Sequence, residues 1–240
     1  MNTSGQKKEI SILLPVHNEA LQIEKCIQEV GVAVSRLSDS YEIIVSEDGS
    51  TDGTDAIVST LLLTDPNLSL LHSNARLGKG RAIKKALERA RGDIVVFMDA
   101  DLATSLDYLP KVLQSVRERD GLAIASRHVE GSVVRRRASR TFFSLAYNVI
   151  VRLLFLDSIR DHQCGFKAMS RKASRAVLDT KSNGFFFDTE MILRCKRQGF
   201  SIVEIGVEWA ETRGKGESKV KLFRDAKRIG LDLLAFRLSP

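Results

Sequence analysis

The chain is poor in cysteine, proline and tryptophan, with three, four and one of these among its 240 residues. The cysteines, Cys26, Cys164 and Cys195, lie too far apart for a disulfide framework or a CxxC zinc site. Four prolines and sixteen glycines exclude collagen-like and proline-rich low-complexity chains. Because the cysteine count is odd and residues 1–9 contain no apolar segment, we expect a reducing, cytoplasmic setting.

The sequence also lacks an apolar run long enough to span a membrane. Its longest such run, residues 142–156, is interrupted by Arg152 and is shorter than the roughly 20 residues that a spanning helix needs. A content of 43% hydrophobic and 28% charged residues is ordinary for a globular protein and excludes wholesale disorder. Together with the length, this composition predicts one domain, or one domain with an appendage.

The net charge of +7 conceals an asymmetry along the chain. Residues 1–120 hold 14 basic and 18 acidic residues, whereas residues 121–240 hold 23 and 12. The positive second half indicates a surface that faces phosphate, nucleic acid or lipid headgroups, and the alternative is a solvated basic surface. Nucleic-acid binding is disfavoured because the basic half has no aromatic-interleaved patch and no known nucleic-acid motif.

Strand and helix patterns alternate through the first half of the chain. Short apolar runs predict strands at residues 9–16, 41–46, 68–72, 93–98 and 122–126. The segments between them predict helices at about residues 18–36, 54–63, 79–91 and 105–119. Strands this apolar, separated by helices, predict an α/β fold with a mostly parallel sheet that is covered on both faces.

Polar residues follow three of these strands at the point where each strand ends. They are residues 15–19, residues 47–52 and the pair Asp99 and Asp101. Open α/β sheets bind ligands beyond the carboxyl ends of their strands, so three clusters at one edge predict a binding site. A single acidic turn is most often a turn or a helix cap, and the prediction therefore depends on their convergence.

Asp99 and Asp101 flank one small residue at the end of a predicted buried strand. Two carboxylates this close repel each other unless a cation neutralises them, and hard oxygen ligands favour Mg²⁺ or Mn²⁺ bound together with substrate phosphates. In the structural alternative, Asp101 caps the helix predicted from Ser105 and Asp99 is a solvated strand end. Asp48 also has two interpretations: its carboxylate accepts hydrogen bonds from a base or ribose, or it forms a turn.

The segment Gly78-Lys79-Gly80 is not a nucleotide-binding P-loop, because Arg81 follows where the GxxxxGK[ST] pattern requires other residues. A Rossmann dinucleotide site is also unsupported, since no GxGxxG follows the first strand. Lys79 is left with two interpretations: a cation near a diphosphate, or an ordinary helix entry.

Four motifs together resemble those of family 2 glycosyltransferases of the GT-A fold: PVHNE at 15–19, EDGSTDGT at 47–54, LGKGRA at 77–82 and DADLA at 99–103. Four more are similar to those of dolichyl-phosphate (polyprenyl-phosphate) hexose synthases: ASR at 125–127, DHQCGFK at 161–167, FFFDTE at 185–190 and RGKGESK at 213–219. The resemblance extends from about residue 10 to 236. It implies one GT-A domain over 1–240, with a nucleotide-binding half at 1–130 and an acceptor half at 131–240.

The resemblance implies roles for individual residues. Four would form the nucleotide pocket, with the last of them holding the base: Pro15, His17, Glu19 and Asp48. Asp99 and Asp101 would sit at the metal and the donor diphosphate, close to Lys79, and Arg127 would face the phosphates across the site. Two would lie near the transferred sugar: Gln163 and Asp188. Three would belong to a mobile loop that clamps phosphate: Arg213, Ser218 and Lys219.

The sequence departs from the family pattern at three positions. His17 stands where the family often has Tyr, and Glu47 where it often has Asp. Ala103 occupies the position of a metal-binding Gln in mannosyl-transferring members. The last departure counts against mannose as the sugar and against a third side-chain ligand for the metal.

The implied reaction is inverting transfer of a hexose, with glucose favoured over mannose, from UDP-glucose or GDP-mannose to dolichyl or polyprenyl phosphate, with Mg²⁺ or Mn²⁺. A phosphate monoester has a second pKa of about 6 and is largely a dianion at neutral pH, so the nucleophile needs no strong base. The demanding step is departure of the nucleoside diphosphate, whose growing charge a divalent cation stabilises as a Lewis acid.

Residues 138–156 and 218–236 predict two amphipathic helices. In the first, Ser144, Asn148 and Arg152 form one narrow polar stripe on an otherwise apolar surface. The second mixes basic and apolar residues, as do helices that lie in the surface of an anionic membrane. We expect peripheral attachment at the cytoplasmic face of a membrane, direct or through an anchoring partner. The alternatives are packing against the sheet or each other, and a homo-oligomer contact.

Three other functions compete with lipid-phosphate glycosylation. The first is a family 2 glycosyltransferase with a soluble sugar or small-molecule acceptor. The second is a sugar nucleotidyltransferase, which is disfavoured because no glycine-rich loop with Arg or Lys follows the first strand. The third is a nucleotide-sensing or lipid-recruiting module without turnover. We expect His72 and His128 to be structural or surface residues, and Cys164 to be a small packed residue.

Overall fold

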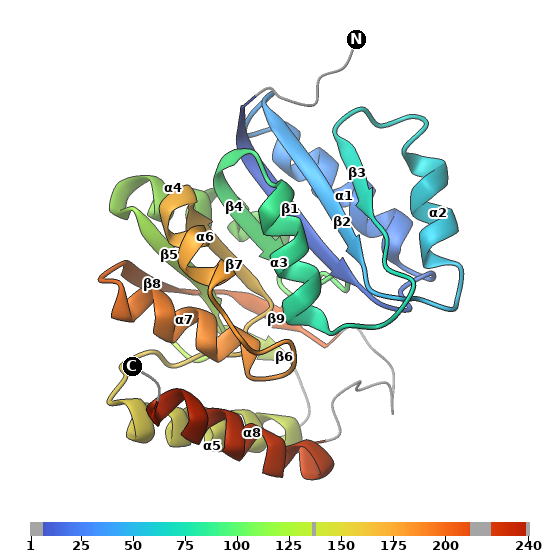
Figure 1. Ribbon diagram of the computed structural model, residues 1–240. Helices are drawn as coiled ribbons and strands as arrows, with labels where there is room; N and C mark the ends of the chain where they lie inside the picture. The colour runs from blue at the N-terminus through green and yellow to red at the C-terminus, as the bar shows by residue number, and fades with distance from the viewer. Residues whose placement is uncertain (1–6, 136–137, 212–221, 239–240) are drawn as a thin grey trace.

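The computed structural model describes residues 7–135, 138–211 and 222–238, which form an α/β body with two helices beneath it (Figure 1). The strands are β1 (Lys8–Val16), β2 (Tyr41–Glu47), β3 (Leu68–Leu71), β4 (Gly92–Met98), β5 (Gly121–Ser126), β6 (Val133–Arg135), β7 (Phe166–Ser170), β8 (Ser201–Gly206) and β9 (Glu208–Ala210). The helices are α1 (Ile23–Ser35), α2 (Thr54–Leu61), α3 (Lys79–Arg89), α4 (Leu109–Arg119), α5 (Ala138–Phe155), α6 (Arg171–Leu178), α7 (Phe187–Arg197) and α8 (Leu222–Leu238), with a 3₁₀ helix η1 (Leu106–Tyr108) before α4.

Seven strands form one sheet in the order β3-β2-β1-β4-β7-β5-β8. Every neighbouring pair in it is parallel except the two pairs made by β7, which runs antiparallel to β4 and β5. The mostly parallel α/β sheet predicted from the sequence is therefore confirmed. Strands β6 and β9 form a separate parallel pair.

The register of the sheet brings the carboxyl ends of β1, β2 and β4 to one edge. Val16 of β1 lies opposite Glu47 of β2, and Leu13 of β1 lies opposite Phe97 of β4. The polar segments that follow these strands consequently start from the same side of the molecule.

Helices cover both faces of the sheet: α3, α6 and α7 pack together on one face, and α1 and α4 lie on the other. Helix α1 buries one stripe of apolar side chains at helical spacing: Ile23, Cys26, Ile27, Val30 and Val34. It begins at Ile23 rather than near residue 18, because Asn18 adopts a left-handed φ of 55° and starts a turn. The predicted helix at 105–119 is also divided, into η1 and α4.

The strands that follow β5 were not predicted from the sequence. Strand β7 lies at the centre of the sheet, yet its five residues, FKAMS, include a lysine and show no clear alternation. All five are buried, including Lys167, whose side chain has no exposure. A buried ion pair with Asp188 allows the charged Lys167 side chain to lie inside the protein. An ion pair between distant segments leaves no local pattern in the sequence, so β7 could not be recognised there.

Helices α5 and α8 lie side by side below the body (Figure 1). They share a second hydrophobic cluster with α7 and the residue before it: Val151, Phe186, Leu193, Ile229, Leu233 and Phe236. The helix predicted at 138–156 is present, and α8 covers the described part of the one predicted at 218–236. Among the described helices, none combines the length and the apolar character needed to cross a membrane.

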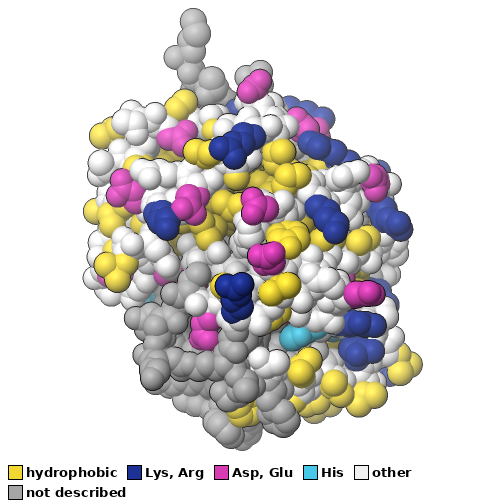
Figure 2. All heavy atoms as spheres, turned by 180° about the vertical axis from the view of Figure 1, so that it is seen from behind, with side chains coloured by type: hydrophobic (Ala, Val, Ile, Leu, Met, Phe, Trp, Pro, Cys, Tyr) yellow, Lys and Arg dark blue, Asp and Glu magenta, His cyan; other side chains and the backbone are white. Residues whose placement is uncertain are grey.

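Large apolar side chains remain exposed on both helices of this pair. On α5 and just after it they are Phe143, Leu145, Val149, Ile150, Leu153 and Leu156, and on α8 they are Leu231, Leu234 and Leu238. Seen from behind, the body mixes both signs of charge, whereas hydrophobic side chains gather at the lower end (Figure 2). We call these nine residues the α5–α8 apolar surface.

A buried polar network fixes α5 to the body. The ring of His162 has no exposure, and its Nδ1 and Nε2 atoms lie 3.0 Å from Oδ1 of Asn148 and 2.8 Å from Oδ2 of Asp157. Lys196 of α7 lies 2.7 Å from the other oxygen of Asp157. Burial alone would raise the pKa of Asp157, but the hydrogen bonds from His162 and Lys196 lower it instead.

Candidate functional site

Asp99 and Asp101 lie at the tip of β4 and line one small pocket of about 20 Å³. Both side chains are partly exposed. The backbone N–H of Asp99 donates to the carbonyl of Gly165 (3.0 Å), and Oδ1 of Asp101 accepts the N–H of Ala103 (3.2 Å). These bonds fix the short turn after the strand and aim two carboxylates at the same edge of the sheet.

The N-cap of η1 is Ser105 and not Asp101. The hydroxyl of Ser105 accepts the N–H of Asp107 at 3.2 Å. The structural alternative for Asp101, a helix cap, is therefore wrong. Its carboxylate stays at the pocket, next to Asp99.

Lys79, the first residue of α3, lies between two carboxylates. Its Nζ atom is 2.9 Å from Oδ1 of Asp99 and 3.4 Å from Oδ2 of Asp188. Burial would lower the pKa of Lys79, but the charges of Asp188 and Asp99 raise it above its usual value. The acidic tip of β4 thus already attracts a cation in this structure.

Asp188 is held by a second, wholly buried lysine. Nζ of Lys167 lies 2.7 Å from Oδ1 of Asp188 and also donates to the carbonyl of Cys164. The ring of Phe97 lies under both ammonium groups, with its centroid 5.6 Å from that of Lys79 and 5.2 Å from that of Lys167. Burial would raise the pKa of Asp188, but Lys167 and Lys79 lower it, so Asp188 is an ionised carboxylate.

The backbone around Lys79 is positioned by Asp48. The two carboxylate oxygens of this buried aspartate accept the N–H groups of Leu77 (2.7 Å) and Gly78 (2.8 Å). Gly78 has a φ of +102°, a conformation that a side chain disfavours. In this structure Asp48 therefore connects the tip of β2 to the LGKG segment, a contact that the sequence did not reveal. Its role toward a base stays a prediction.

The tip of β1 is joined to the turn after β2. Pro15 pairs with Ser46 in the sheet, and Nδ1 of His17 lies 2.9 Å from the carbonyl of Asp48. The N–H of Glu19 donates to the hydroxyl of Thr54 at 2.9 Å. The first two polar clusters are therefore one connected structure, as the convergence argument predicts, while the roles of these residues toward a nucleotide stay predictions.

Arg127 follows β5 and forms a two-pronged ion pair with Asp161. Both its Nε and Nη2 atoms lie 2.8 Å from the carboxylate oxygens, and its backbone N–H donates to the same group. Burial would raise the pKa of Asp161, but the Arg127 charge and its hydrogen bonds lower it. The guanidinium also lies 5.7 Å from the ring centroid of Trp209, which lines the same pocket as Asp99. Arg127 is thus close to the acidic tip but firmly held.

Gln163 connects the site to α5. Its amide nitrogen donates to the hydroxyl of Thr189 (3.0 Å) and to the carbonyl of Phe185 (3.2 Å). The Tyr147 hydroxyl of α5 lies 2.7 Å from the same Thr189 oxygen. Sequence patterns contain no signal for Tyr147 or Thr189, because their hydrogen-bond partners lie 16 to 42 residues away along the chain.

His72 and His128 each contact a polar side chain, and Cys164 lies in the core. His72 is exposed and lies 2.7 Å from Glu47, and Nε2 of His128 lies 3.2 Å from the hydroxyl of Ser144. Cys164 is fully buried, which raises its pKa to about 11. Its thiol is therefore not an activated nucleophile.

The predicted phosphate-clamping loop, with Arg213, Ser218 and Lys219, lies outside the described residues. Within the described part of the chain, no three His, Cys, Asp or Glu side chains are grouped so as to hold a metal ion. Two carboxylates nevertheless fit Mg²⁺ or Mn²⁺, which bind through one or two carboxylates plus substrate phosphates. The ammonium bound at Asp99 shows that this edge favours a positive charge.

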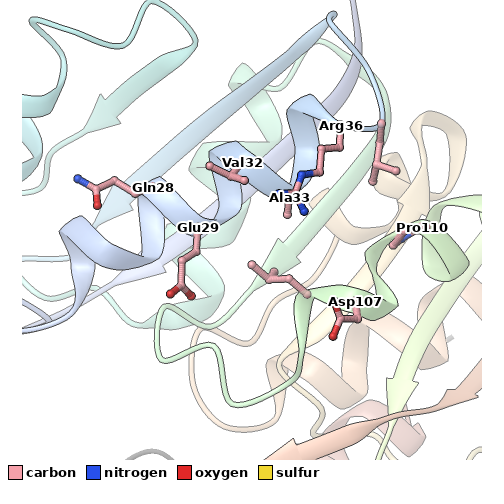
Figure 3. A pocket seen from close by; sticks show the side chains of 9 residues that line it. Gln28, Glu29, Val32, Ala33, Arg36, Asp107 and Pro110 are labelled. Carbon is pink, nitrogen blue, oxygen red and sulfur yellow. The ribbon is translucent and has the colours of Figure 1, made fainter.

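A larger groove of about 490 Å³ lies elsewhere, between α1, η1 and the start of α4 (Figure 3). Its walls carry charges of both signs, Glu29, Arg36 and Asp107, around a floor that includes Val32. None of the predicted site residues lines it. Size alone does not identify the site here.

The mostly parallel seven-stranded sheet, with two aspartates at the tip of strand β4, has the GT-A fold of solved glycosyltransferases. Glucosyl-3-phosphoglycerate synthase from Mycobacterium tuberculosis, solved with Mn²⁺, uridine diphosphate and phosphoglyceric acid, has this fold. It matches with a TM-score of 0.71 and 22% identity over 97% of this chain and 80% of that one. At this identity the likeness bears on the fold alone, and it confirms the predicted fold class.

The family model described as Glycosyl transferase family 2 matches residues 11–178. The chain belongs to this family, as its motifs predict. It is 41% identical to the glycosyltransferase AglD of Haloferax volcanii over 94% of this chain, and spans 36% of that protein's length. It is 30% identical to the dolichyl-phosphate beta-glucosyltransferase of Homo sapiens, over 99% of this chain and 81% of that one.

Proposed function

We propose that this chain transfers a hexose, glucose in preference to mannose, from a nucleoside-diphosphate sugar to a polyprenyl or dolichyl phosphate. The observation that carries the proposal is the pair Asp99 and Asp101 in one pocket at the tip of β4, beside Lys79 and Arg127. The similarity to the human dolichyl-phosphate beta-glucosyltransferase supports the choice of acceptor and sugar.

In this proposal the first half of the chain, residues 1–130, binds the donor. Asp99 and Asp101 would hold Mg²⁺ or Mn²⁺, and the ion would act as a Lewis acid toward the charge on the departing diphosphate. Lys79 adds a positive charge on the same side, while the surroundings of Pro15, His17, Glu19 and Asp48 bind the nucleoside. The Mycobacterium tuberculosis synthase, which shares the fold and was solved with Mn²⁺ and uridine diphosphate, supports such a site.

Residues 131–240 then receive the acceptor. An oxygen of the lipid phosphate attacks the anomeric carbon while the bond to the diphosphate oxygen breaks, which inverts the configuration. The acceptor is already largely a dianion at neutral pH, so Asp188 need not accept a proton. With Lys167 bound to it, Asp188 serves to hold charge beside the sugar and to orient Lys79.

The α5–α8 apolar surface supplies the route to a lipid. Leu153 and Leu156 are 73% and 84% exposed, and Leu238 is 84% exposed. Burying one such side chain in a membrane interface contributes about 1.5–3 kcal/mol. We infer peripheral attachment to the cytoplasmic face of a membrane through this surface. Gln163 and Tyr147 connect it to the reaction site.

The test is a donor screen with labelled UDP-glucose and GDP-mannose, polyprenyl phosphate and purified chain in detergent. We expect label from UDP-glucose in an organic-extractable product that mild acid releases as the sugar. Label that stays in the aqueous phase, on an added soluble acceptor, would replace the lipid acceptor by a small molecule. Label in neither the lipid product nor the soluble acceptor would contradict the proposal. Retained anomeric configuration would overturn the inverting step.

A further inference from the structure

Four side chains at the proposed site form one row of alternating charges: Asp99, Lys79, Asp188 and Lys167. The distances along the row are 2.9 Å, 3.4 Å and 2.7 Å. The row carries no net charge, and its negative end is the carboxylate at the pocket. A positively charged side chain of the protein itself therefore already pairs with Asp99 at the acidic tip.

The two lysines differ in how firmly they are held. Lys167 has no exposure and makes the shorter bond to Asp188, with a further bond to a backbone carbonyl. The Lys79 side chain is 33% exposed and lies at the longer distance from Asp188. Of the two cations, Lys79 is the one that can leave, because Lys167 keeps Asp188 paired after it has gone.

The backbone of Lys79 stays in place when its side chain moves. On one side, Asp48 accepts the N–H of Gly78 at 2.8 Å. On the other, the N–H of Gly80 donates to the carbonyl of Asn183 at 3.1 Å. Rotation about the lysine side chain is therefore the available movement.

We propose that Lys79 is an internal counter-ion that occupies the cation position at Asp99 in the ligand-free protein and competes there with the divalent metal ion. Metal binding requires the ammonium to leave Asp99, and a nucleoside diphosphate gives it a new anionic partner. Metal and nucleotide therefore bind with positive cooperativity, which must be reciprocal. This inference rests on the metal site of the proposed function and adds an order: metal alone binds weakly, and metal with nucleotide binds tightly.

The experiment measures Mn²⁺ binding directly, by electron paramagnetic resonance of free Mn²⁺ and by calorimetry, without any turnover. The proteins are the unaltered full chain, Lys79→Met and Lys79→Gln, with Lys85→Met as the control that removes a lysine from the same helix. Asp101→Asn reports whether the Mn²⁺ measured is at this pocket. Each protein is titrated alone and with UDP or GDP, and circular dichroism checks that it is folded.

Without nucleotide, we expect Lys79→Met and Lys79→Gln to bind Mn²⁺ at least tenfold more tightly than the unaltered chain and Lys85→Met. Addition of the diphosphate then raises Mn²⁺ affinity in every protein, because its oxygens are metal ligands, but the increase is at least threefold larger in the unaltered chain than in the Lys79 variants. Equal or weaker Mn²⁺ binding by the Lys79 variants overturns the inference. If sugar transfer to lipid phosphate persists in that case, the proposed function stands and only the counter-ion role fails.

Discussion

The Nζ atom of Lys167 lies 2.7 Å from Oδ1 of Asp188, and neither side chain is more than 6% exposed. A pair of this kind contributes little net stability, since removing both charges from water offsets most of their attraction. Breaking it is a different matter, because the remaining charge is left buried. The pair therefore sets what substitutions β7 can tolerate.

We expect Lys167→Met to lower the free energy of unfolding by about 3–5 kcal/mol. The double variant Lys167→Met with Asp188→Leu should lose less, because the buried carboxylate is removed together with its main partner and Lys79 keeps Asp99. Urea unfolding followed by circular dichroism measures both. A single variant as stable as the unaltered chain would show that the buried pair is not needed by the fold.

Gly80 is a second position where packing restricts the sequence. A Cβ atom there would lie 2.6 Å from the Phe187 ring and 2.8 Å from the carbonyl of Ser182. Gly80→Ala should therefore cost about 1–3 kcal/mol of stability and lower sugar transfer by displacing Lys79. Gly184→Ala is the control, because a Cβ there meets nothing within 4 Å. Equal thermal midpoints for the two variants would be inconsistent with this packing.

Acid should destabilise the protein through its paired carboxylates. Asp157, Asp161 and Asp188 each have a pKa held below the ordinary value of an unfolded aspartate, about 3.9. Their stabilising contribution is thus complete above about pH 5 and is lost as pH falls through the lower folded values. Unfolding free energies measured at pH 7, 5, 4 and 3 should change little between pH 7 and 5 and decline mainly between pH 4 and 3. A constant value down to pH 3 would contradict the ion pairs.

A substitution at Asp161 tests the ion pair with Arg127 on its own. Asp161→Asn leaves Arg127 without its counter-charge in a site that is only 10% exposed for the arginine, and should cost about 3–5 kcal/mol at pH 7. The matched control is Asp120→Asn, which removes an exposed pair with Lys172 and should cost less than about 1 kcal/mol. Similar losses for both variants would mean that Arg127 finds another partner.

The sequence predicted the first half of the fold well because each element there has its own signal. The runs at 9–16, 41–46 and 93–98 are mostly apolar, and the structure places strands at Lys8–Val16, Tyr41–Glu47 and Gly92–Met98. The convergence of their polar ends follows from the parallel sheet alone. The order of strands and helices therefore sufficed to place Asp99 and Asp101 at the same edge of the sheet as residues 15–19 and 47–52.

The second half could not be derived in the same way. Strand β7 depends on Lys167 finding Asp188 across 21 residues of chain, and Arg127 depends on Asp161 across 34. Such ion pairs form only when distant segments meet in the folded chain, and they leave no periodic pattern in the sequence. The motifs at 161–167 and 185–190 pointed to this region by resemblance, but which of their side chains meet is a result of the fold.

The α5–α8 apolar surface should govern binding to vesicles. Ile150→Glu and Leu153→Glu, at positions 54% and 73% exposed, should each weaken binding to vesicles of phosphatidylcholine and phosphatidylglycerol about tenfold or more, given the transfer energy of one large side chain. Leu63→Glu is the control, since Leu63 is 85% exposed after α2. Sedimentation with vesicles measures the bound fraction. Unchanged binding by the α5 variants would assign the membrane contact to another surface.

The most direct test of the central claim is sugar transfer by Asp101→Asn compared with Asp93→Asn, which alters an exposed aspartate at the other end of β4. Each is assayed with labelled donor and polyprenyl phosphate, after chelation with EDTA and after return of Mn²⁺. We expect EDTA to stop transfer by the unaltered chain and by Asp93→Asn, and Mn²⁺ to restore both. Asp101→Asn should stay at least about a hundredfold slower while folded. Transfer that continues in EDTA, or at an undiminished rate in Asp101→Asn, would contradict the central claim.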